Sequence, residues 1–204
     1  MVPLFIAKLS KRLDECLPGR AAQEIMMIRP KRFKSKVNQK KVPAAVLILL
    51  YPFDNEWYFF LTKRTKTVEH HKGQVSLPGG AIEKNESAMD ASLRETYEEI
   101  GIDSSTLRII GQLSSLYTPV SYFNIHVFLW YANTKPDINI DNNEVEKVYK
   151  ISFDELTDDN LVSHTPISKS GIEINVPAFH FNECICWGAT AMILTELKDL
   201  IKEL

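Results

Sequence analysis

The sequence predicts an α/β (α+β) fold in which a mixed β-sheet is flanked by helices. Three observations favour this fold: short apolar stretches of the β type, turn residues between them, and helical patterns at both ends and in the middle of the chain. Strands mixed with few helices are typical of a sheet that is covered by helices. With 204 residues and 45% hydrophobic content, the chain has enough apolar surface for an ordered domain, which excludes an intrinsically disordered protein.

The N-terminal region is expected to be helical and then basic. Residues 3–27 show the apolar spacing of one or two short helices, interrupted at Pro18 and Gly19. Residues 29–41 contain seven basic residues and no acidic one. This stretch either helps to bind a phosphate-rich ligand or is a solvated connector. We therefore divide the chain into an N-terminal helical extension with a basic connector, residues 1–41, and a main domain, residues 42–204.

The main domain is predicted to begin with two strands and to end with a helix. The two strands, at 44–50 and 57–61, are separated by turn residues at 52–55. A helical segment then follows Pro78-Gly79-Gly80 and ends at Gly101, a residue type that often terminates helices. Further strands are expected at 107–116, 125–131, 145–151 and 172–176. An amphipathic helix is expected from about residue 189 to the end of the chain.

Charge and cysteine content narrow the class of protein. The 24 Lys and Arg residues against 26 Asp and Glu residues give a formal charge of -2, without the basic excess typical of nucleic-acid or anionic-membrane binding. Cys16, Cys184 and Cys186 are too few for a disulfide framework, and we find neither a secretory signal nor an apolar run of about 20 residues. We expect a cytoplasmic protein with a small-molecule partner and no nucleic acid or membrane partner; a homodimer is left open.

The most informative feature is an acidic face on the helix expected at 87–100. At about 100° per residue, Glu95, Glu98 and Glu99 project from one side of this helix. The residues expected to face the core on the opposite side are Met89, Leu93, Thr96, Tyr97 and Ile100. Clustered carboxylates without a neutralising lysine suit a hard divalent cation, which can clamp phosphate oxygens. The alternative is an ordinary solvated face, although the preceding glycines and Glu86 favour a metal site.

The residues from Gly80 to Ile102 spell G-x5-E-x7-R-E-x2-E-E-x-G-I. This pattern resembles the signature of the Nudix hydrolases. One position differs, because Thr96 stands where the family usually has an aliphatic residue; on the predicted helix it faces the core, so the difference concerns packing. The resemblance implies a Nudix-type α/β/α sandwich with a mixed central sheet, and residues 42–204 would be the Nudix hydrolase domain.

The resemblance also implies which residues hold the metal. Glu95, Glu98 and Glu99, together with the carbonyl of Gly80, would bind Mg²⁺ or Mn²⁺. Glu86 would support them, and Arg94 would orient the glutamates through charge-assisted hydrogen bonds.

The same resemblance implies hydrolysis of a diphosphate linkage. The metal ions would activate a water that attacks one phosphorus, and a carboxylate would take the proton of that water. In this family the base is either Glu95 itself or a carboxylate from a later loop. Glu144 is our candidate in such a loop, and its alternative is a solvated loop acid.

A second resemblance covers residues 60–80. They are similar to the motif of the coenzyme A pyrophosphatase branch, approximately L-L-T-x-R-S-x3-R-x3-G-x3-F-P-G-G, with the same spacing. The four differing positions are Phe60, Thr65, Glu69 and Leu77. Glu69 replaces an arginine and reverses its charge, for which His70, His71 and Lys72 would compensate. The motif implies substrate-binding roles for Arg64, Lys72, Gly73 and Gly79.

We therefore expect a metal-dependent enzyme that cleaves coenzyme A or acyl-coenzyme A to 3',5'-ADP and (acyl-)phosphopantetheine. The first alternative is a Nudix enzyme for another nucleoside diphosphate derivative, such as ADP-ribose, a nucleotide sugar or a nucleoside triphosphate. The second is a non-enzymatic ligand sensor on the same fold, which the intact signature disfavours.

Overall fold

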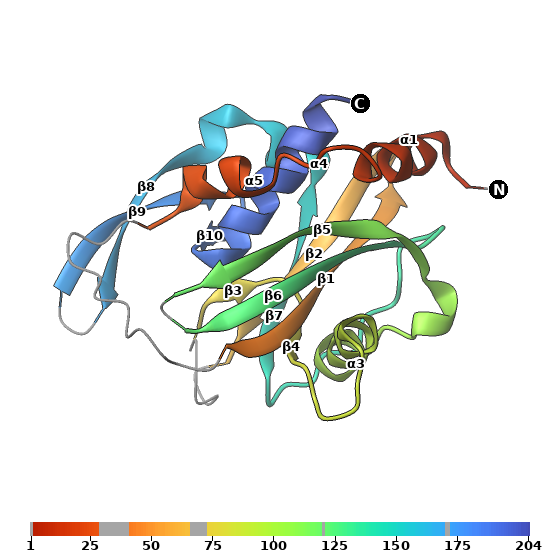
Figure 1. Cartoon of the computed structure of the whole chain (residues 1–204), viewed down its shortest axis with the longest axis horizontal. Coiled ribbons are helices and arrows are strands. Elements are labelled where there is room, and N and C mark those ends of the chain that lie inside the picture. Colours follow the sequence, from red (N-terminus) through yellow and green to blue (C-terminus); the bar gives the residue numbers. More distant parts are fainter. Residues whose placement is uncertain (1, 29–40, 66–72, 120, 170–171) are drawn as a thin grey trace.

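The computed structural model describes residues 2–28, 41–65, 73–119, 121–169 and 172–204 (Figure 1). The main sheet contains β1 (Val42–Phe53), β2 (Glu56–Arg64), β3 (Val75–Ser76), β4 (Gly79–Ala81), β5 (Arg108–Thr118), β6 (Phe123–Tyr131) and β7 (Val145–Ser152). A second sheet contains β8 (Val162–Lys169), β9 (Ile172–His180) and β10 (Ile185–Trp187). The α-helices are α1 (Leu4–Leu13), α2 (Gly19–Gln23), α3 (Ala88–Ile100), α4 (Phe153–Thr157) and α5 (Ala189–Lys202), and the short 3-10 helices are η1 (Glu24–Met26), η2 (Ser104–Thr106) and η3 (Asp159–Leu161).

The main sheet is mixed, as the sequence predicts. Its strand order is β3-β2-β1-β6-β5, while β4 pairs with β1 and β7 pairs with β2. The pairing of β1 with β6 is parallel, and the other pairings of this sheet are antiparallel. Only the first part of β1 pairs with β4, whereas its last residues pair with β2. This divergence lets the Gly-Gly segment of β4 lie against the start of β1.

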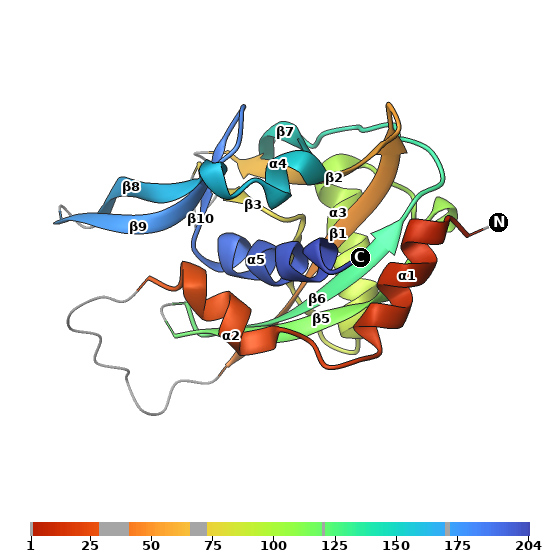
Figure 2. The same ribbon diagram turned by 90° about the horizontal axis from the view of Figure 1, so that it is seen from above.

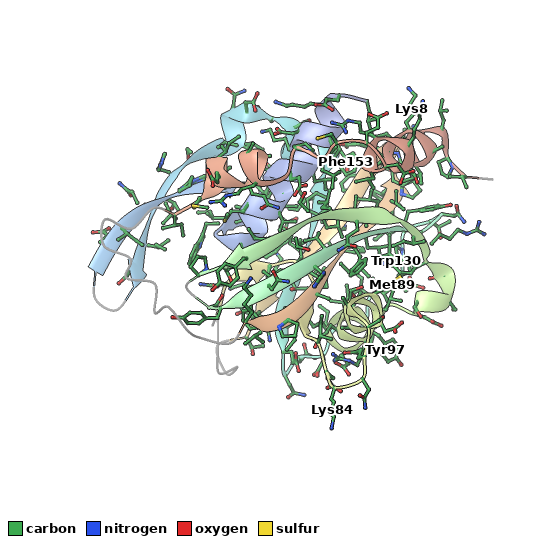
Figure 3. The ribbon with its side chains drawn as sticks, viewed as in Figure 1. Lys8, Lys84, Met89, Tyr97, Trp130 and Phe153 are labelled. Atoms are coloured by element: carbon green, nitrogen blue, oxygen red, sulfur yellow. The ribbon has the colours of Figure 1, made fainter. Side chains whose placement is uncertain are left out.

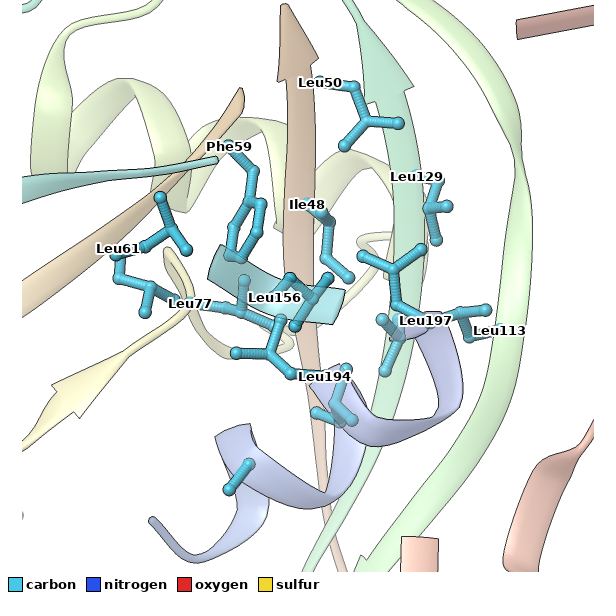
Figure 4. Close-up of a cluster of buried hydrophobic side chains, with 14 of the residues drawn as sticks. Ile48, Leu50, Phe59, Leu61, Leu77, Leu113, Leu129, Leu156, Leu194 and Leu197 are labelled. Carbon is cyan, nitrogen blue, oxygen red and sulfur yellow. The ribbon is translucent and has the colours of Figure 1, made fainter. Parts of the chain in front are cut away.

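Helices cover both faces of the sheet, so the α/β/α sandwich is confirmed. Helix α3 lies on one face, and α1, α2 and α5 lie on the other (Figures 1 and 2). Strand β1 is buried on both sides, because Leu47 and Leu49 belong to the cluster beneath α3 while Ile48 and Leu50 belong to the cluster beneath α5. Figure 4 shows the cluster beneath α5, in which leucines from α4 and α5 pack on β1, β2 and β6.

The local signals for α3 determine where it begins and ends. The side chain of Ser87 accepts a hydrogen bond from the backbone N–H of Asp90 at 3.1 Å, which caps the first turn. Gly101 ends the helix with φ of 70°, and its N–H donates to the carbonyl of Tyr97. Because both ends of α3 are fixed, the rotation of the helix about its own axis is fixed too. The directions in which its glutamates project are therefore defined.

The N-terminal helices contribute to the same core as the sheet. Ile6, Leu9 and Leu13 of α1, together with Met26, are buried in the cluster beneath α5. The helix break at Pro18-Gly19 is confirmed, since α2 begins at Gly19. The basic stretch lies outside the described residues except for Lys41, so the division of the chain at residues 41 and 42 stays a prediction.

Most expected strands are present and are longer than their apolar stretches. The turn between β1 and β2 uses Asp54 and Asn55 at positive φ, which suits a tight hairpin. Five further elements carry no clear signal in the sequence: β3, β4, β8, β10 and α4. No helix within the described ranges is long and apolar enough to cross a membrane.

Candidate active site

The two glycines of β4 bring the main chain close to β1 and to α3. A Cβ atom on Gly79 would lie 2.3 Å from the carbonyl oxygen of Ala45, and a Cβ atom on Gly80 would lie 2.5 Å from the Glu95 carboxylate. Gly79 also has φ of 147°, which side chains rarely allow. Glycine at both positions therefore permits the contact between β4 and the acidic helix.

The acidic helix face is not uniform in exposure. The side chain of Glu98 is 51% exposed and that of Glu95 is 16% exposed, whereas that of Glu99 is only 1% exposed. Thr96 and Ile100 are buried, as predicted. The prediction that Tyr97 and Met89 face the core is wrong: they are 61% and 40% exposed (Figure 3). The sheet contacts α3 along Ser92, Thr96, Glu99 and Ile100, so the buried stripe is rotated toward Glu99.

Arg94 bridges three of the four signature glutamates. Its Nε and Nη2 donate to the two oxygens of Glu86 at 2.8 and 3.1 Å. Its Nη1 donates to Glu95 Oε1 at 3.0 Å and to Glu98 Oε2 at 2.7 Å. These hydrogen bonds lower the pKa of Glu86. In Glu95, burial raises the pKa and Arg94 opposes the shift. The structure thus brings Arg94 to the glutamates that it is predicted to orient.

Glu99 is paired through only one of its two oxygens. Arg64 Nη1 of β2 donates to Glu99 Oε1 at 3.1 Å. Glu99 Oε2 is buried without a hydrogen-bond partner among the described residues. Burial raises the pKa of Glu99 to about 8; Arg64 opposes this shift, and the charges of Glu95 and Glu144 add to it. A buried carboxylate oxygen without a partner is costly, so an additional partner at this atom would be favourable.

The loop that carries Glu144 folds against both β2 and the end of α3. The backbone N–H of Thr65 donates to the carbonyl of Glu144, and the backbone N–H of Asp141 donates to the carbonyl of Glu99. The Glu144 side chain is 44% exposed, and its Oε2 lies 3.9 Å from Arg64 Nη2. The structure therefore places Glu144 beside the acidic helix, although the two are more than forty residues apart in the sequence.

The predicted substrate-binding residues occupy different surroundings. Gly79 packs on β1, and Arg64 contacts Glu99 and Glu144. Gly73 has φ of 68°, and among the described residues a Cβ atom there would meet nothing within 4 Å. Lys72 lies outside the described residues, as do Glu69, His70 and His71. The substrate-binding roles stay predictions.

Comparison with known proteins identifies the family. Residues 41–169 match the NUDIX domain model. This chain belongs to the Nudix hydrolase family. It is 30% identical to Nudix hydrolase 3 of Caenorhabditis elegans over 68% of this chain. The matched part spans 58% of that relative's length. It is 27% identical to the uncharacterized Nudix hydrolase NudL of Cronobacter sakazakii over 90% of this chain and 94% of that one.

Solved structures show the same fold at low sequence identity. The Nudix hydrolase RenU from M. smegmatis superposes with a TM-score of 0.57 and 14% identity, covering 80% of this chain and 88% of that one. The MutT protein from Methanosarcina mazei Go1 superposes with a TM-score of 0.51 and 17% identity, covering 82% and 100% of the two chains. The mixed α/β architecture is therefore that of Nudix proteins.

Nudix hydrolases use divalent metal ions, and the residues at this site fit such an ion. The unpaired Oε2 of Glu99, the neighbouring carboxylates and the close approach of Gly80 to Glu95 supply oxygen atoms, which Mg²⁺ and Mn²⁺ prefer. Within the described part of the chain, no three His, Cys, Asp or Glu side chains already form a metal-ligand group. Instead, arginine nitrogens contact one oxygen each of Glu95, Glu98 and Glu99. The assignment of these ligands stays a prediction.

The structure contains a small cavity beside Glu98 that was not predicted from the sequence. It has a volume of about 230 Å³ and lies where the end of α3 meets the following loop. Its lining residues are Tyr97, Glu98, Gly101, Asn139, Ile140 and Asp141. No local motif marks residues 139–141, because they reach the site only through main-chain hydrogen bonds to Glu99 and Ile100.

Proposed function

We propose that this Nudix protein hydrolyses the diphosphate linkage of coenzyme A or acyl-coenzyme A with Mg²⁺ or Mn²⁺, giving 3',5'-ADP and (acyl-)phosphopantetheine. The observation that carries the hydrolase part of the proposal is the convergence of Glu95, Glu99 and Glu144 around a buried oxygen without a partner. Such a cluster is unfavourable by itself and becomes favourable when it holds a divalent cation.

In the proposed reaction, Glu95, Glu98, Glu99 and the Gly80 carbonyl hold the metal. When bound, a divalent cation neutralises phosphate oxygens and lowers the pKa of water. Arg94 keeps Glu86, Glu95 and Glu98 in fixed orientations through its hydrogen bonds. Reaction at one phosphorus then needs a base for the proton of the attacking water.

Glu144 is our first candidate for that base, and Glu95 is the second. The Glu144 side chain is partly exposed and faces the acidic helix, so it can exchange a proton with solvent and approach a water in the site. Glu95 is held by Arg94 and lies against Gly80, which favours a ligand role over proton transfer. A Glu144→Gln variant separates the two candidates, because it removes only the loop carboxylate.

The coenzyme A assignment rests on the motif at residues 60–80. The described residues of this motif belong largely to β2, β3 and β4. Strand β2 pairs with β3 and with β1, and β1 pairs with β4 beside α3. Arg64 and Gly80 of the motif both contact signature glutamates. ADP-ribose, a nucleotide sugar or a nucleoside triphosphate remains the alternative substrate, because Glu69 departs from the coenzyme A motif.

A side-by-side turnover panel with product identification tests the substrate. We expect coenzyme A and acetyl-coenzyme A to yield 3',5'-ADP, with ADP-ribose and nucleoside triphosphates cleaved more slowly. If coenzyme A stays intact while ADP-ribose is cleaved, the coenzyme A assignment fails but the hydrolase assignment holds. If no diphosphate is cleaved and a ligand still binds, the sensor alternative gains support.

The charge reversal at Glu69 offers a separate test of specificity. A Glu69→Arg variant restores the arginine that is usual in the coenzyme A motif. We expect a lower KM for coenzyme A, because the substrate carries a 3'-phosphate as well as its diphosphate. Unchanged kinetics would show that this position does not contact the phosphates.

We also propose a cytoplasmic location. Cys16 is exposed, Cys184 and Cys186 are buried, and all three are unpaired. Free thiols are the usual state in a reducing compartment. Fractionation of cells that produce the tagged chain at its natural level tests this, and recovery in an oxidising compartment would contradict it.

A further inference from the structure

Arg64 lies between two carboxylates that come from different parts of the fold. Its side chain points to the α3 side of β2, as do Phe60 and Thr62, because alternate residues of a strand share a face. Nη1 contacts Glu99 on α3, and Nη2 lies 3.9 Å from Glu144 on the loop before β7. Among the described residues, Arg64 is therefore the positively charged side chain that lies between Glu99 of α3 and Glu144 of the loop.

The strand opposite Arg64 is irregular. Lys63 pairs with Lys147 and Arg64 pairs with Val145, so β7 has one extra residue, Glu146, which forms a β-bulge. Bulges are frequent beside active sites, and here the alternation of side chains along β2 itself is uninterrupted. The neighbouring residue of β2, Lys63, contacts Glu146 at 2.6 Å near the surface. Two adjacent basic residues of β2 thus serve separate ion pairs.

The charges at this site set up a competition. Glu99 is almost fully buried, so its ionised form needs positive neighbours, and among the described residues Arg64 supplies one to Oε1 only. A divalent cation at the free Oε2 would lie close to the Arg64 guanidinium, and two positive charges so close in a poorly solvated site repel each other. Arg64 and the cation therefore compete for the charge of the same carboxylate.

We infer that Arg64 is a positioning residue that is held between Glu99 and Glu144 when the site holds no metal, and that a divalent cation displaces it. The displaced guanidinium is then free to bind the phosphates of the substrate. The inference rests on the proposed function, because it assigns the cation to these carboxylates. It links metal loading to the availability of a phosphate-binding arginine.

Mn²⁺ affinity is the first test. An Arg64→Met variant keeps much of the aliphatic stem and removes the charge, and Lys63→Met is the matched control on the other face of β2. By titration of the metal-free proteins with Mn²⁺, followed by the EPR signal of free Mn²⁺, we expect Arg64→Met to bind at least about tenfold more tightly than the unmodified chain. Lys63→Met should bind as the unmodified chain does. Equal or weaker binding by a folded Arg64→Met overturns the inference.

The unmodified protein supplies a second test that does not depend on folding of a variant. The ¹⁵N–¹H signal of the Arg64 Nε should move as Mg²⁺ fills the site, in proportion to the bound fraction. A signal that stays in place at saturation overturns the inference. A double-mutant cycle adds a control: in a Glu99→Gln background, Arg64→Met should change Mn²⁺ affinity much less.

These results are distinguishable from failure of the proposed function. If the unmodified chain binds no Mn²⁺ and cleaves no diphosphate, the proposed function fails. If it binds Mn²⁺ and cleaves a diphosphate but Arg64→Met binds Mn²⁺ equally, only the role of Arg64 is wrong. When the inference holds, Arg64→Met also raises KM, because the substrate loses a phosphate contact although the metal is bound more tightly.

Discussion

Two buried glutamates on opposite faces of the sheet show how similar burial can serve different purposes. Glu99 of α3 and Glu196 of α5 both have a relative exposure of 0%. Glu196 accepts hydrogen bonds through both oxygens: Oε1 from the backbone N–H of Ser114 at 3.1 Å and Oε2 from Gln23 Nε2 at 2.9 Å. Glu99 has Arg64 on one oxygen and, within the described part of the chain, no hydrogen-bond partner on the other.

At equal burial, the two carboxylates are therefore distinguished by their hydrogen bonds: the partners of Glu196 satisfy both of its oxygens, whereas those of Glu99 leave one oxygen open to a ligand. Glu196 joins α2, α5 and β5, so its partners come from the elements that it holds together. Glu99 is surrounded by the charges of Glu95 and Glu144, and its unpaired oxygen faces a cluster that can accept a cation. The same substitution at the two positions should therefore have opposite consequences.

The largest expected effect is on activity in Glu99→Gln. The substitution keeps the shape of the side chain and removes the charge that a metal needs. We expect hydrolysis to fall by at least about a hundredfold, in line with the loss of a strong electrostatic contribution, while folding remains intact. Steady-state kinetics with circular dichroism as the folding control measure this. Near-normal turnover would contradict the metal-binding role of Glu99.

A smaller loss of activity is expected for Gly80→Ala. The added Cβ would lie 2.5 Å from the Glu95 carboxylate, so Glu95 must move. A displacement near 1 Å can reduce turnover by about a hundredfold, and we expect a loss of about ten- to a hundredfold.

Gly111→Ala is the matched control on the α5 side of the fold. Its Cβ would lie 2.8 Å from Leu13 of α1, so it should lower the melting temperature and leave the turnover of the folded enzyme unchanged. Equal losses of turnover in both variants would show that crowding anywhere disturbs the site, and would remove the distinction between the two faces.

Glu196→Gln should affect stability and spare the chemistry. An amide places an N–H₂ group where Ser114 or Gln23 also donates, so one buried hydrogen bond is lost. We expect the free energy of unfolding to fall by about 1–3 kcal/mol, measured by urea denaturation. Turnover per folded molecule should be unchanged. A catalytic loss comparable with that of Glu99→Gln would refute the structural role.

The last expected effect, which is spread over several pH units, is a pH slope in the stability of the metal-free protein. The pKa of Glu99 is raised from 4.5 to about 8, so the folded state retains a proton that the unfolded state has released in this range. Stability should therefore decrease as pH rises from 4.5 to 8, and Mn²⁺ affinity should increase. Glu99→Gln should remove the part of the pH dependence that Glu99 causes, as measured by urea titrations at several pH values. A slope that is unaltered in Glu99→Gln would assign it to other groups.

Much of the fold was predictable from local patterns. The continuous apolar run of β1, the capping residues of α3 and the amphipathic spacing of α5 act over short distances, so the sequence reveals them. Strands β3, β4 and β10 were not predictable, because each has only two or three residues and exists through its pairing: β4 with the distant β1, β3 with β2, and β10 with the adjacent β9. The exposure of Tyr97 was also missed, since periodicity identifies a stripe but not its rotation toward the sheet.

The family, the acidic helix and the glycines beside it can be identified without a structure, because they depend on residue type and on spacing within one segment. The differences between the carboxylates arise only when the chain is folded. The tertiary structure buries Glu99 and exposes Glu98, although they are neighbours in the chain, and it brings Arg64 and Glu144 to the same carboxylate from other elements. The physical reason is that burial and counter-ions are set by which elements pack together, and such long-range contacts leave no periodic signal in the chain.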